Sequence, residues 1–164
     1  MDSKNQLSSR SGFIEPSQHL AARCVFSYFR TMIKKTVTQL LEGANLRLTR
    51  TRKAIAQLLY EDGLNRHVSA EWVARELDEA GEKIALATVY NTLNSFVEAG
   101  LLRQIQTGGQ AVIFDTNTDE HCHFLRESTG ELIDIAPGMV DLGKIPEPPT
   151  GMRVKGWDVI IRVD

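Results

Sequence analysis

The stretch Thr118–Leu125, TDEHCHFL, sets two histidines on either side of a cysteine. His121 and His123 are two of the four histidines in the chain, and Cys122 is one of its two cysteines. On a β-strand, residues two apart point to the same side, so both imidazoles could bind one ion while the cysteine faces away. Residues 115–134 contain six acidic side chains and a single basic one, which favours a cation. From spacing alone, a metal site and a solvated loop that is rich in histidine both remain open.

The composition is typical of a soluble folded protein. Of 164 residues, 42% are hydrophobic and 24% charged, enough for one ordinary domain or two small ones. No apolar run approaches the eighteen or so residues that span a bilayer, and the polar first residues show no secretory signal. Two distant cysteines, Cys24 and Cys122, do not make a disulfide framework. We therefore expect a cytoplasmic protein without a membrane partner.

Charge is distributed unevenly along the chain. Residues 1–53 hold ten Lys and Arg against three Asp and Glu, whereas the remainder holds nine against eighteen. A basic front predicts an anionic partner and an acidic remainder predicts cations. Two solvated surfaces of opposite sign would explain the same numbers.

Helices are expected in the first two thirds of the chain. Residues 1–22 are polar and predict a disordered tail, and the apolar spacing from Arg23 to Leu41 predicts an amphipathic helix that ends at Gly43. Three more helices should follow, each opened by a capping residue or a change in pattern and closed by a glycine. Their expected limits are Thr49 and Gly63, Ser69 and Gly81, and Ala87 and Gly100.

Two strand-like runs come next, LLRQIQT and AVIFDT, joined by Gly108-Gly109-Gln110 in a predicted hairpin turn. Three helices and a hairpin are the order of a winged helix-turn-helix, in which the helix from Ala87 would read DNA. Its polar residues include asparagines, which can form paired hydrogen bonds with adenine. A helical subdomain with a polar outer face, as in some protein-binding modules, is the alternative.

The last third of the sequence predicts strands. His123–Leu125 and Glu131–Ile135 should pair around a turn, Val140–Gly151 is too rich in Gly and Pro for a helix, and Met152–Val163 alternates again. Such a thin layer needs a cover, which a second copy would provide in a twofold homodimer. The expected fold class is α+β, with a tail (1–22), a winged-helix DNA-binding domain (23–117) and a β-rich dimerisation and sensor domain (118–164).

The segments GANLRLTRTRKAI, RHVSAEWV, LATVYNTLNSFVEAGLLRQI and FDTNTDEHCHF resemble the ferric uptake regulator family, most closely its iron response regulator (Irr) branch. The resemblance covers about residues 40–135. It implies a dimeric winged-helix repressor of iron homeostasis, whose affinity for operator DNA responds to a metal or, in the Irr branch, to haem. Arg47 matches a basic residue that reaches the minor groove, Tyr90 matches a tyrosine of the recognition helix, and Asn91 follows the Irr form. The expected DNA-binding residues are Arg47, Arg50, Arg52, Thr88, Tyr90, Asn91 and Asn94.

The same resemblance implies a set of metal ligands. His67 matches a histidine between two helices, Asp115 stands where many relatives have glutamate, and Asp134 matches an acid on a later strand. With His121 and His123 they form a His₃Asp₂ set that suits one Fe(II), Mn(II) or Zn(II) ion per subunit. For His67, a capping or packed histidine is the alternative.

The chain also departs from the family. Arg126 and Thr129 stand where many relatives carry a CxxC pair, so a Cys₄ structural zinc is not expected. Irr proteins are associated with haem at the histidine cluster, which makes His121, Cys122 and His123 candidate haem ligands, since a thiolate can bind haem iron. No Cys-Pro haem motif is present, because Cys24 is followed by Val25.

The leading hypothesis is therefore a dimeric, iron- or haem-responsive DNA-binding repressor. One alternative is a winged-helix protein whose sensor site no longer functions. Another is an enzyme that uses a metal-bound water. The sequence offers no paired general base, nucleophile motif or phosphate-binding glycine loop to support an enzyme.

Overall fold

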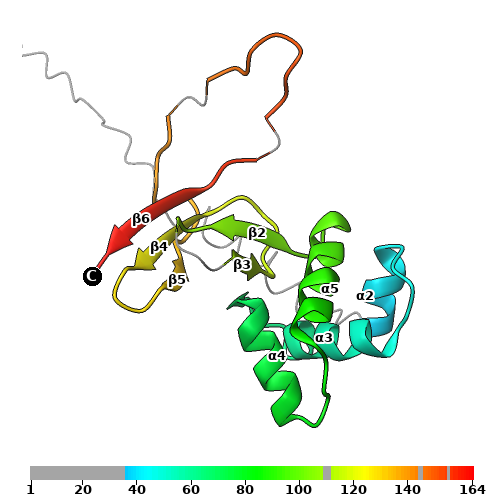
Figure 1. Ribbon diagram of the computed structural model, residues 1–164. Coiled ribbons are helices and arrows are strands. Elements are labelled where there is room, and N and C mark those ends of the chain that lie inside the picture. Colours follow the sequence, from blue (N-terminus) through cyan, green and yellow to red (C-terminus); the bar gives the residue numbers. More distant parts are fainter. Residues whose placement is uncertain (1–35, 109–111, 144–145, 155) are drawn as a thin grey trace, which may run out of the picture. The chain divides into compact units, whose positions relative to one another are not determined.

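The computed structural model describes residues 36–164 apart from 109–111, 144–145 and 155 (Figure 1). The tail predicted for residues 1–22 lies outside the described residues, as does most of the helix predicted from Arg23. Helices α2 to α5 lie in the first part of this region. One strand of the first three-stranded sheet lies between α3 and α4 and its other two strands follow α5, and the last three strands form a second sheet. No helix among the described residues is long and apolar enough to span a membrane.

Four helices form the first part of the fold: α2 (Val37–Gly43), α3 (Arg50–Tyr60), α4 (Ala70–Glu79) and α5 (Leu86–Glu98). The predicted caps of α3 and α4 are confirmed, since Thr49 accepts the backbone N–H of Arg52 and Ser69 that of Trp72. These caps satisfy N–H groups that have no partner within the helix.

The helix predicted to continue from Arg23 to Leu41 is wrong at Thr36. This residue is extended, with φ −62° and ψ 153°, and forms a reciprocal capping box with Gln39. A new helix therefore begins at Val37, although the apolar spacing continues across the break.

The four helices bury one core together with the first sheet. Leu41, Ile55, Leu59, Leu93 and Phe96 are fully buried, and Phe114 of the sheet is 1% exposed. Burying side chains of this size contributes about 1.5–3 kcal/mol each relative to exposure. This core holds the first sheet, including the polar residues at the ends of its strands, against the helices.

The first sheet has the order β1-β3-β2, from β1 (His67–Val68), β2 (Arg103–Gln106) and β3 (Val112–Asp115), all antiparallel. The predicted β2–β3 hairpin is confirmed, although its tip lies outside the described residues. The two-residue strand β1 was not predicted. It sets His67 opposite Asp115.

The second sheet has the order β5-β4-β6, from β4 (Cys122–Arg126), β5 (Glu131–Asp134) and β6 (Val159–Val163). Strand β5 is antiparallel to β4 and sets Asp134 opposite His123, whereas β6 is parallel to β4. The strand predicted from Met152 begins only at Val159, and the described residues between β5 and β6 form neither helix nor strand. That connection agrees with the Gly and Pro content of the segment.

A second, small core joins the β2–β3 hairpin to the second sheet. Ile105 of β2 is fully buried with Leu125 of β4 and Leu132 of β5, and Ile113 and Ile160 pack at its edge. Residues from β1, β3, β4 and β5 meet next to this contact.

Candidate metal centre

Five side chains with metal-ligating groups converge where the two sheets meet. They come from β1, the end of β3, the start of β4 and the end of β5, and one ligand atom from each lies within 4.8 Å of all the others. The residues are His67, Asp115, His121, His123 and Asp134. The structure thus brings together the complete set of ligands predicted by resemblance.

Strand pairing explains this convergence. In the first sheet His67 faces Asp115, and in the second His123 faces Asp134. Residues that face each other across a ladder project on the same side, and so do residues two apart along a strand. His121 directly precedes β4, and its ring lies beside that of His123, with the two centroids 4.3 Å apart. Cys122, which lies between them, does not belong to the cluster.

The distances fit five donors around one small ion. Asp115 Oδ2 lies 3.5, 3.2 and 3.6 Å from the Nε2 atoms of His67, His121 and His123. Asp134 Oδ1 lies 2.9, 3.2 and 3.5 Å from the same three atoms. Two ligands about 2.1 Å from an ion are about 3.0 Å apart at a right angle and about 3.6 Å apart at 120°. All six separations fall within or next to that range.

Burial and missing hydrogen bonds also indicate an ion. Asp115 and His123 are fully buried and His121 is 7% exposed. Asp115 Oδ2, His67 Nε2 and both ring nitrogens of His123 are buried without a hydrogen-bond partner, although His67 Nε2 lies 2.9 Å from Asp134 Oδ1. Buried polar atoms are rarely left this way, and each costs about 1–3 kcal/mol. A bound cation would satisfy them together.

The cluster carries negative charge for a cation to neutralise. Burial raises the pKa of Asp115, but contacts with His123 and His67 outweigh it and leave that pKa well below its usual range. The contact with His67 likewise lowers the pKa of Asp134. Burial opposes protonation of His67, yet both carboxylates together raise its pKa to about 9. The two ionised carboxylates therefore hold a proton on His67 when no other cation neutralises them.

Neighbouring groups orient two of the five side chains. Asp115 Oδ1 accepts the backbone N–H of Asn117 at 2.8 Å. His121 Nδ1 lies 2.7 Å from the Asp119 carbonyl oxygen, which can only accept, so Nδ1 carries the proton. His121 Nε2 faces the two carboxylates, 3.2 Å from Asp134 Oδ1 and 3.2 Å from Asp115 Oδ2, so an ion bound between them would take over the Nε2 contact.

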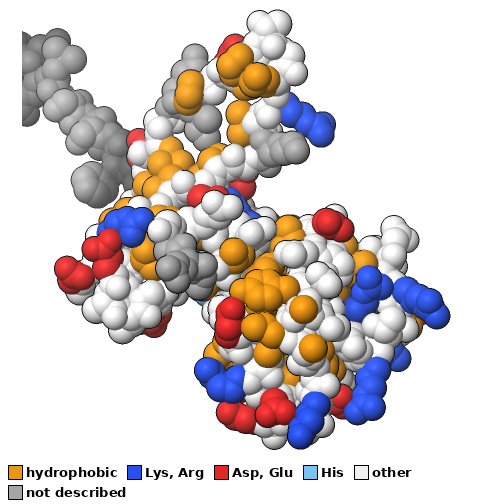
Figure 2. Space-filling view, viewed as in Figure 1, with side chains coloured by type: hydrophobic (Ala, Val, Ile, Leu, Met, Phe, Trp, Pro, Cys, Tyr) orange, Lys and Arg blue, Asp and Glu red, His pale blue; other side chains and the backbone are white. Residues whose placement is uncertain are grey.

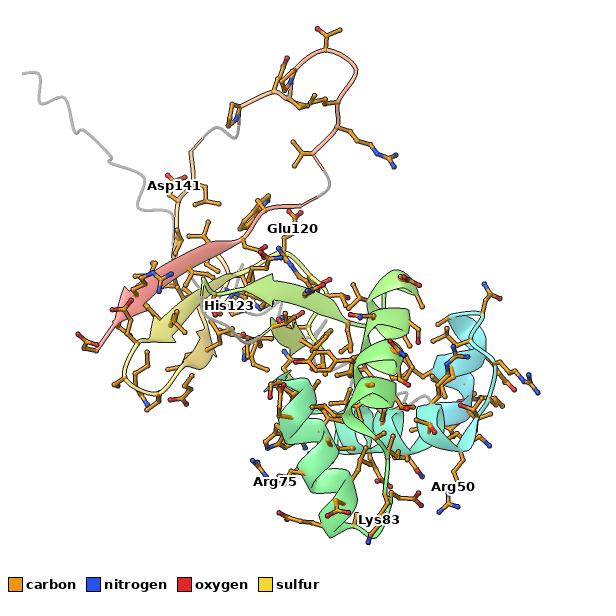
Figure 3. The ribbon with its side chains drawn as sticks, in the orientation of Figure 1. Arg50, Arg75, Lys83, Glu120, His123 and Asp141 are labelled. Atoms are coloured by element: carbon orange, nitrogen blue, oxygen red, sulfur yellow. The ribbon has the colours of Figure 1, made fainter. Side chains whose placement is uncertain are left out.

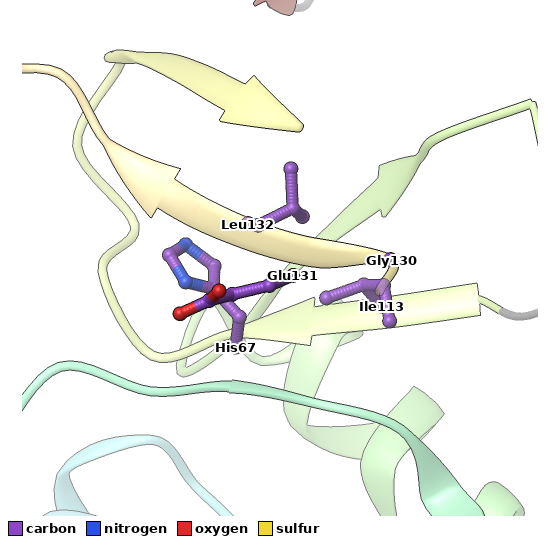
Figure 4. Close-up of a pocket in the computed structure, with 5 residues that line it drawn as sticks. All are labelled: His67, Ile113, Gly130, Glu131 and Leu132. Carbon is purple, nitrogen blue, oxygen red and sulfur yellow. The ribbon is translucent and has the colours of Figure 1, made fainter. Parts of the chain in front are cut away.

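A cavity of about 270 Å³ adjoins the His67 side of the cluster (Figure 4). It is lined by His67, Ile113, Gly130, Glu131 and Leu132. His67 and Asp134 are also the most exposed of the five ligands, with side chains 15% and 33% exposed. The cluster is therefore open on this side and closed around Asp115 and His123.

The residues predicted to bind DNA lie on α5 and around the start of α3. On α5, Thr88, Asn91 and Asn94 are exposed, whereas Tyr90 is half-buried and its hydroxyl donates to Glu71 Oε1 at 2.7 Å. The polar face of α5 is thus open to solvent, but the Tyr90 hydroxyl is already hydrogen-bonded to Glu71.

Two of the arginines predicted to bind DNA form hydrogen bonds within the protein. Arg50 is exposed but donates to both carboxylate oxygens of Glu82, at 3.1 and 3.0 Å. Arg52 donates to the carbonyl of Arg47 at 3.1 Å. Glu82 therefore competes with any other anion for the Arg50 guanidinium.

Two basic residues at this surface were not predicted. Arg75 and Lys83 are exposed, and Lys83 comes three residues before α5 (Figure 3). Lys and Arg side chains gather over the helical part in Figure 2, whereas His123 lies in the sheets in Figure 3. A basic residue directly before the helix was the signal that could have identified Lys83.

Comparison with known proteins places the chain in a family. The model of the Ferric uptake regulator family matches residues 43–145. The chain belongs to this family. Its members are transcription regulators and not enzymes, and all five clustered residues lie inside the matched region.

Individual relatives agree with this assignment. The ferric uptake regulation protein of Pseudomonas aeruginosa is 39% identical over 102 residues, which are 62% of this chain and 75% of that protein. The peroxide operon regulator of Bacillus subtilis is 29% identical over 121 residues, 73% of this chain and 82% of that one. A structure of the Pseudomonas aeruginosa ferric uptake regulator with manganese superposes with a TM-score of 0.59 at 28% identity, covering 79% of this chain and 97% of that chain. Fur proteins thus share the mixed α+β architecture seen here.

Proposed function

We propose that this Fur-family chain is a metal-responsive transcription regulator that holds one Fe(II), Mn(II) or Zn(II) ion per subunit. The ligands would be His67, Asp115, His121, His123 and Asp134. The observation that carries the proposal is the convergence of these five donors with several buried atoms left without a partner. Nitrogen and oxygen donors of this kind suit these three ions.

The ligands also suggest how an ion would influence DNA binding. When bound, the ion would neutralise the two carboxylates and link the two sheets. His67 and Asp115 belong to the first sheet, which packs on the helices, whereas His123 and Asp134 belong to the second. Without a cation, repulsion between the Asp115 and Asp134 carboxylates, one on each sheet, favours separation of the sheets, so occupancy would bias how the helices are held.

For DNA, we propose that α5 is the recognition helix of a winged helix-turn-helix and the β2–β3 hairpin its wing. The exposed Thr88, Asn91 and Asn94 would read bases. Tyr90 would act only after leaving Glu71. The arginines Arg47, Arg50 and Arg52 would contact phosphates, which position a protein without reading sequence.

For assembly, we propose a homodimer formed through the outer face of the second sheet. Ladder register sets Phe124 beside Ile133 of β5 and Ile161 of β6 on that face. Ile133 and Ile161 are 37% and 38% exposed in the single chain. Two such faces in contact would bury this apolar surface and present two recognition helices to two half-sites.

A finer proposal places the chain in the Irr branch, as a repressor of iron homeostasis that releases DNA when haem is plentiful. Asn91 on α5 and the absence of the CxxC pair at Arg126 and Thr129 support the branch. Haem binding at His121, Cys122 or His123 would require the cluster to open, because all three are buried. Burial therefore favours the divalent ion as the first ligand to test.

The decisive experiment measures metal binding and DNA binding on the same samples. Metal-depleted full-length protein would be titrated without oxygen with Fe(II), Mn(II), Zn(II) and haem separately. Affinity for a duplex selected from a random pool would then be measured by fluorescence anisotropy. We expect one divalent ion per subunit and a change of DNA affinity with it.

Two variants complete this experiment. The double variant His121→Ala/His123→Ala should lose both the binding and the response, and Cys122→Ser, a buried neighbour outside the cluster, should retain them. If the double variant responds to metal as the wild type does, the cluster is not the sensor. A response to haem alone would instead support the finer proposal.

A further inference from the structure

Arg103 is a largely buried cation beside the cluster, and its partners are unusual. It is the first residue of β2, opposite the ligand Asp115 on β3, and its side chain is 15% exposed. A charge this buried needs partners that compensate for the water it has lost. Its contacts therefore show what it holds in place.

The guanidinium of Arg103 joins three points of the second part of the fold. One nitrogen donates to the carbonyl of Asp119 at 3.2 Å. The other donates to the carbonyl of Trp157 and lies 2.6 Å from Asp158 Oδ1. Asp119 precedes the ligand His121 by two residues, and Asp158 directly precedes β6. Both segments are more than fifteen residues away in sequence.

The contact of Arg103 with the Asp119 carbonyl matters because that carbonyl also bonds to a proposed metal ligand. The same oxygen accepts from His121 Nδ1 at 2.7 Å, and on the other side of the ring Nε2 lies 3.2 Å from both Asp134 Oδ1 and Asp115 Oδ2, where an ion would sit. Arg103 thus fixes the acceptor that sets the orientation and tautomer of a ligand. Partners of this kind change metal affinity by about 10- to 100-fold when they are removed.

We propose that Arg103 is a positioning residue of the metal centre, acting on His121 through the Asp119 carbonyl while it anchors the start of β6 beside the ligand strand. The inference rests on the proposed metal function. Lysine cannot replace this role in full, because an ammonium lacks the planar fork that reaches several acceptors at once.

Arg162 provides a matched control. It lies on β6 and also joins that strand to the hairpin, since it donates to the Thr107 carbonyl at 2.9 Å and to Glu127 at 3.0 Å. Neither Thr107 nor Glu127 is one of the five clustered residues. Arg162→Gln therefore removes a hairpin contact of similar kind without touching the His121 support.

The test uses Co(II) binding to metal-depleted full-length protein, followed by its absorption bands and by competition with a chelator of known affinity. We expect Arg103→Gln to weaken binding by at least about tenfold, Arg103→Lys to weaken it less, and Arg162→Gln to stay within about threefold of wild type. NMR of the zinc form should show the His121 Nδ1–H exchanging slowly with solvent in wild type and Arg162→Gln, because the Asp119 carbonyl holds it, but exchanging faster in Arg103→Gln.

Each result decides between readings. Wild-type affinity and wild-type exchange of the His121 N–H in Arg103→Gln would overturn the inference while leaving the metal site standing. Equal losses in the Arg103 and Arg162 variants would also overturn it, because they would show general loosening of the hairpin. Should Arg103→Gln fail to fold, Arg103→Lys decides alone, and an unchanged Co(II) spectrum and unchanged N–H exchange refute the role. If the wild type binds no Co(II), the proposed metal function fails, and this inference with it.

Discussion

Replacing His123 by alanine should remove most of the thermal stabilisation that a divalent ion gives. His123 is fully buried, and its Nε2 lies 3.6 Å from Asp115 Oδ2 and 3.5 Å from Asp134 Oδ1, so it is a central donor of the cluster. A water that fills the vacated space would be a weaker, neutral ligand. Loss of a direct ligand should therefore weaken affinity by at least the roughly 100-fold known for the loss of indirect support.

The size of the effect follows from linkage. An ion present at about 100 times its dissociation constant stabilises the folded state by about 2.7 kcal/mol. A folded unit of about 130 residues unfolds with an entropy near 0.27 kcal/mol/K, so the wild type should gain about 10 °C in melting temperature. At the same concentration, a variant that binds about 100-fold more weakly gains about 0.4 kcal/mol, or about 1.5 °C.

Calorimetry of chelator-treated protein with and without Mn(II) measures both gains. Because each variant is compared with its own metal-free form, the cost of the cavity left by alanine cancels. Cys122→Ser, at a buried neighbour outside the cluster, should gain as much as the wild type. A full 10 °C shift in His123→Ala would refute the assignment of His123 as a ligand, and no shift in wild type would refute the site.

Three further predictions concern DNA and assembly. Glu82→Gln should raise affinity for any duplex at low salt by about two- to fivefold, because it frees the Arg50 guanidinium to contact phosphate. Unchanged affinity in filter binding over a series of salt concentrations would show that Arg50 does not face DNA. Asn91→Ala should relax base preference by about tenfold with little change in non-specific affinity, as measured by competition between selected and random duplexes; retained selectivity would move recognition away from α5. Ile161→Asp should yield a monomer in analytical ultracentrifugation while the helical circular dichroism is retained, and a persistent dimer would exclude the outer face of the second sheet as the interface.

Local signals in the sequence were enough for the elements with strong caps or alternation. Thr49 and Ser69 open α3 and α4 as expected, because a side-chain oxygen at that position satisfies the helix irrespective of the rest of the fold. The break at Thr36 was missed because apolar periodicity runs across it, and only the reciprocal bonds with Gln39 reveal the cap. Strand β1 was not predicted, because an alternation of apolar and polar residues cannot be recognised in a strand of two residues.

The proposed metal site likewise contains some contacts that a local sequence pattern predicts and others that it does not. The spacing of His121 and His123 predicts that their side chains share one side of a strand; both imidazoles do join the cluster, although His121 directly precedes β4 and is not part of it. The approach of His67 and Asp134 depends on pairings in two different sheets, so only resemblance to a family could supply them. Contacts such as Arg103 with Asp158 join residues 55 apart, and no local pattern records them. The Arg50–Glu82 pair, 32 residues apart, escaped prediction for the same reason.

The parallel pairing of β4 with β6 has a consequence for the order in which the protein acquires its parts during synthesis. Every proposed ligand has been made by Asp134, but the second edge of β4 stays unpaired until Val159–Val163 is available. The helices and the β2–β3 hairpin depend on nearer contacts and can fold while the ribosome is still adding the long connection to β6. A growing chain should thus form α5 well before β4, which carries His123, is paired on both of its edges. Released chains that end at residue 135 and at residue 164 should differ in metal retention far more than in helix content.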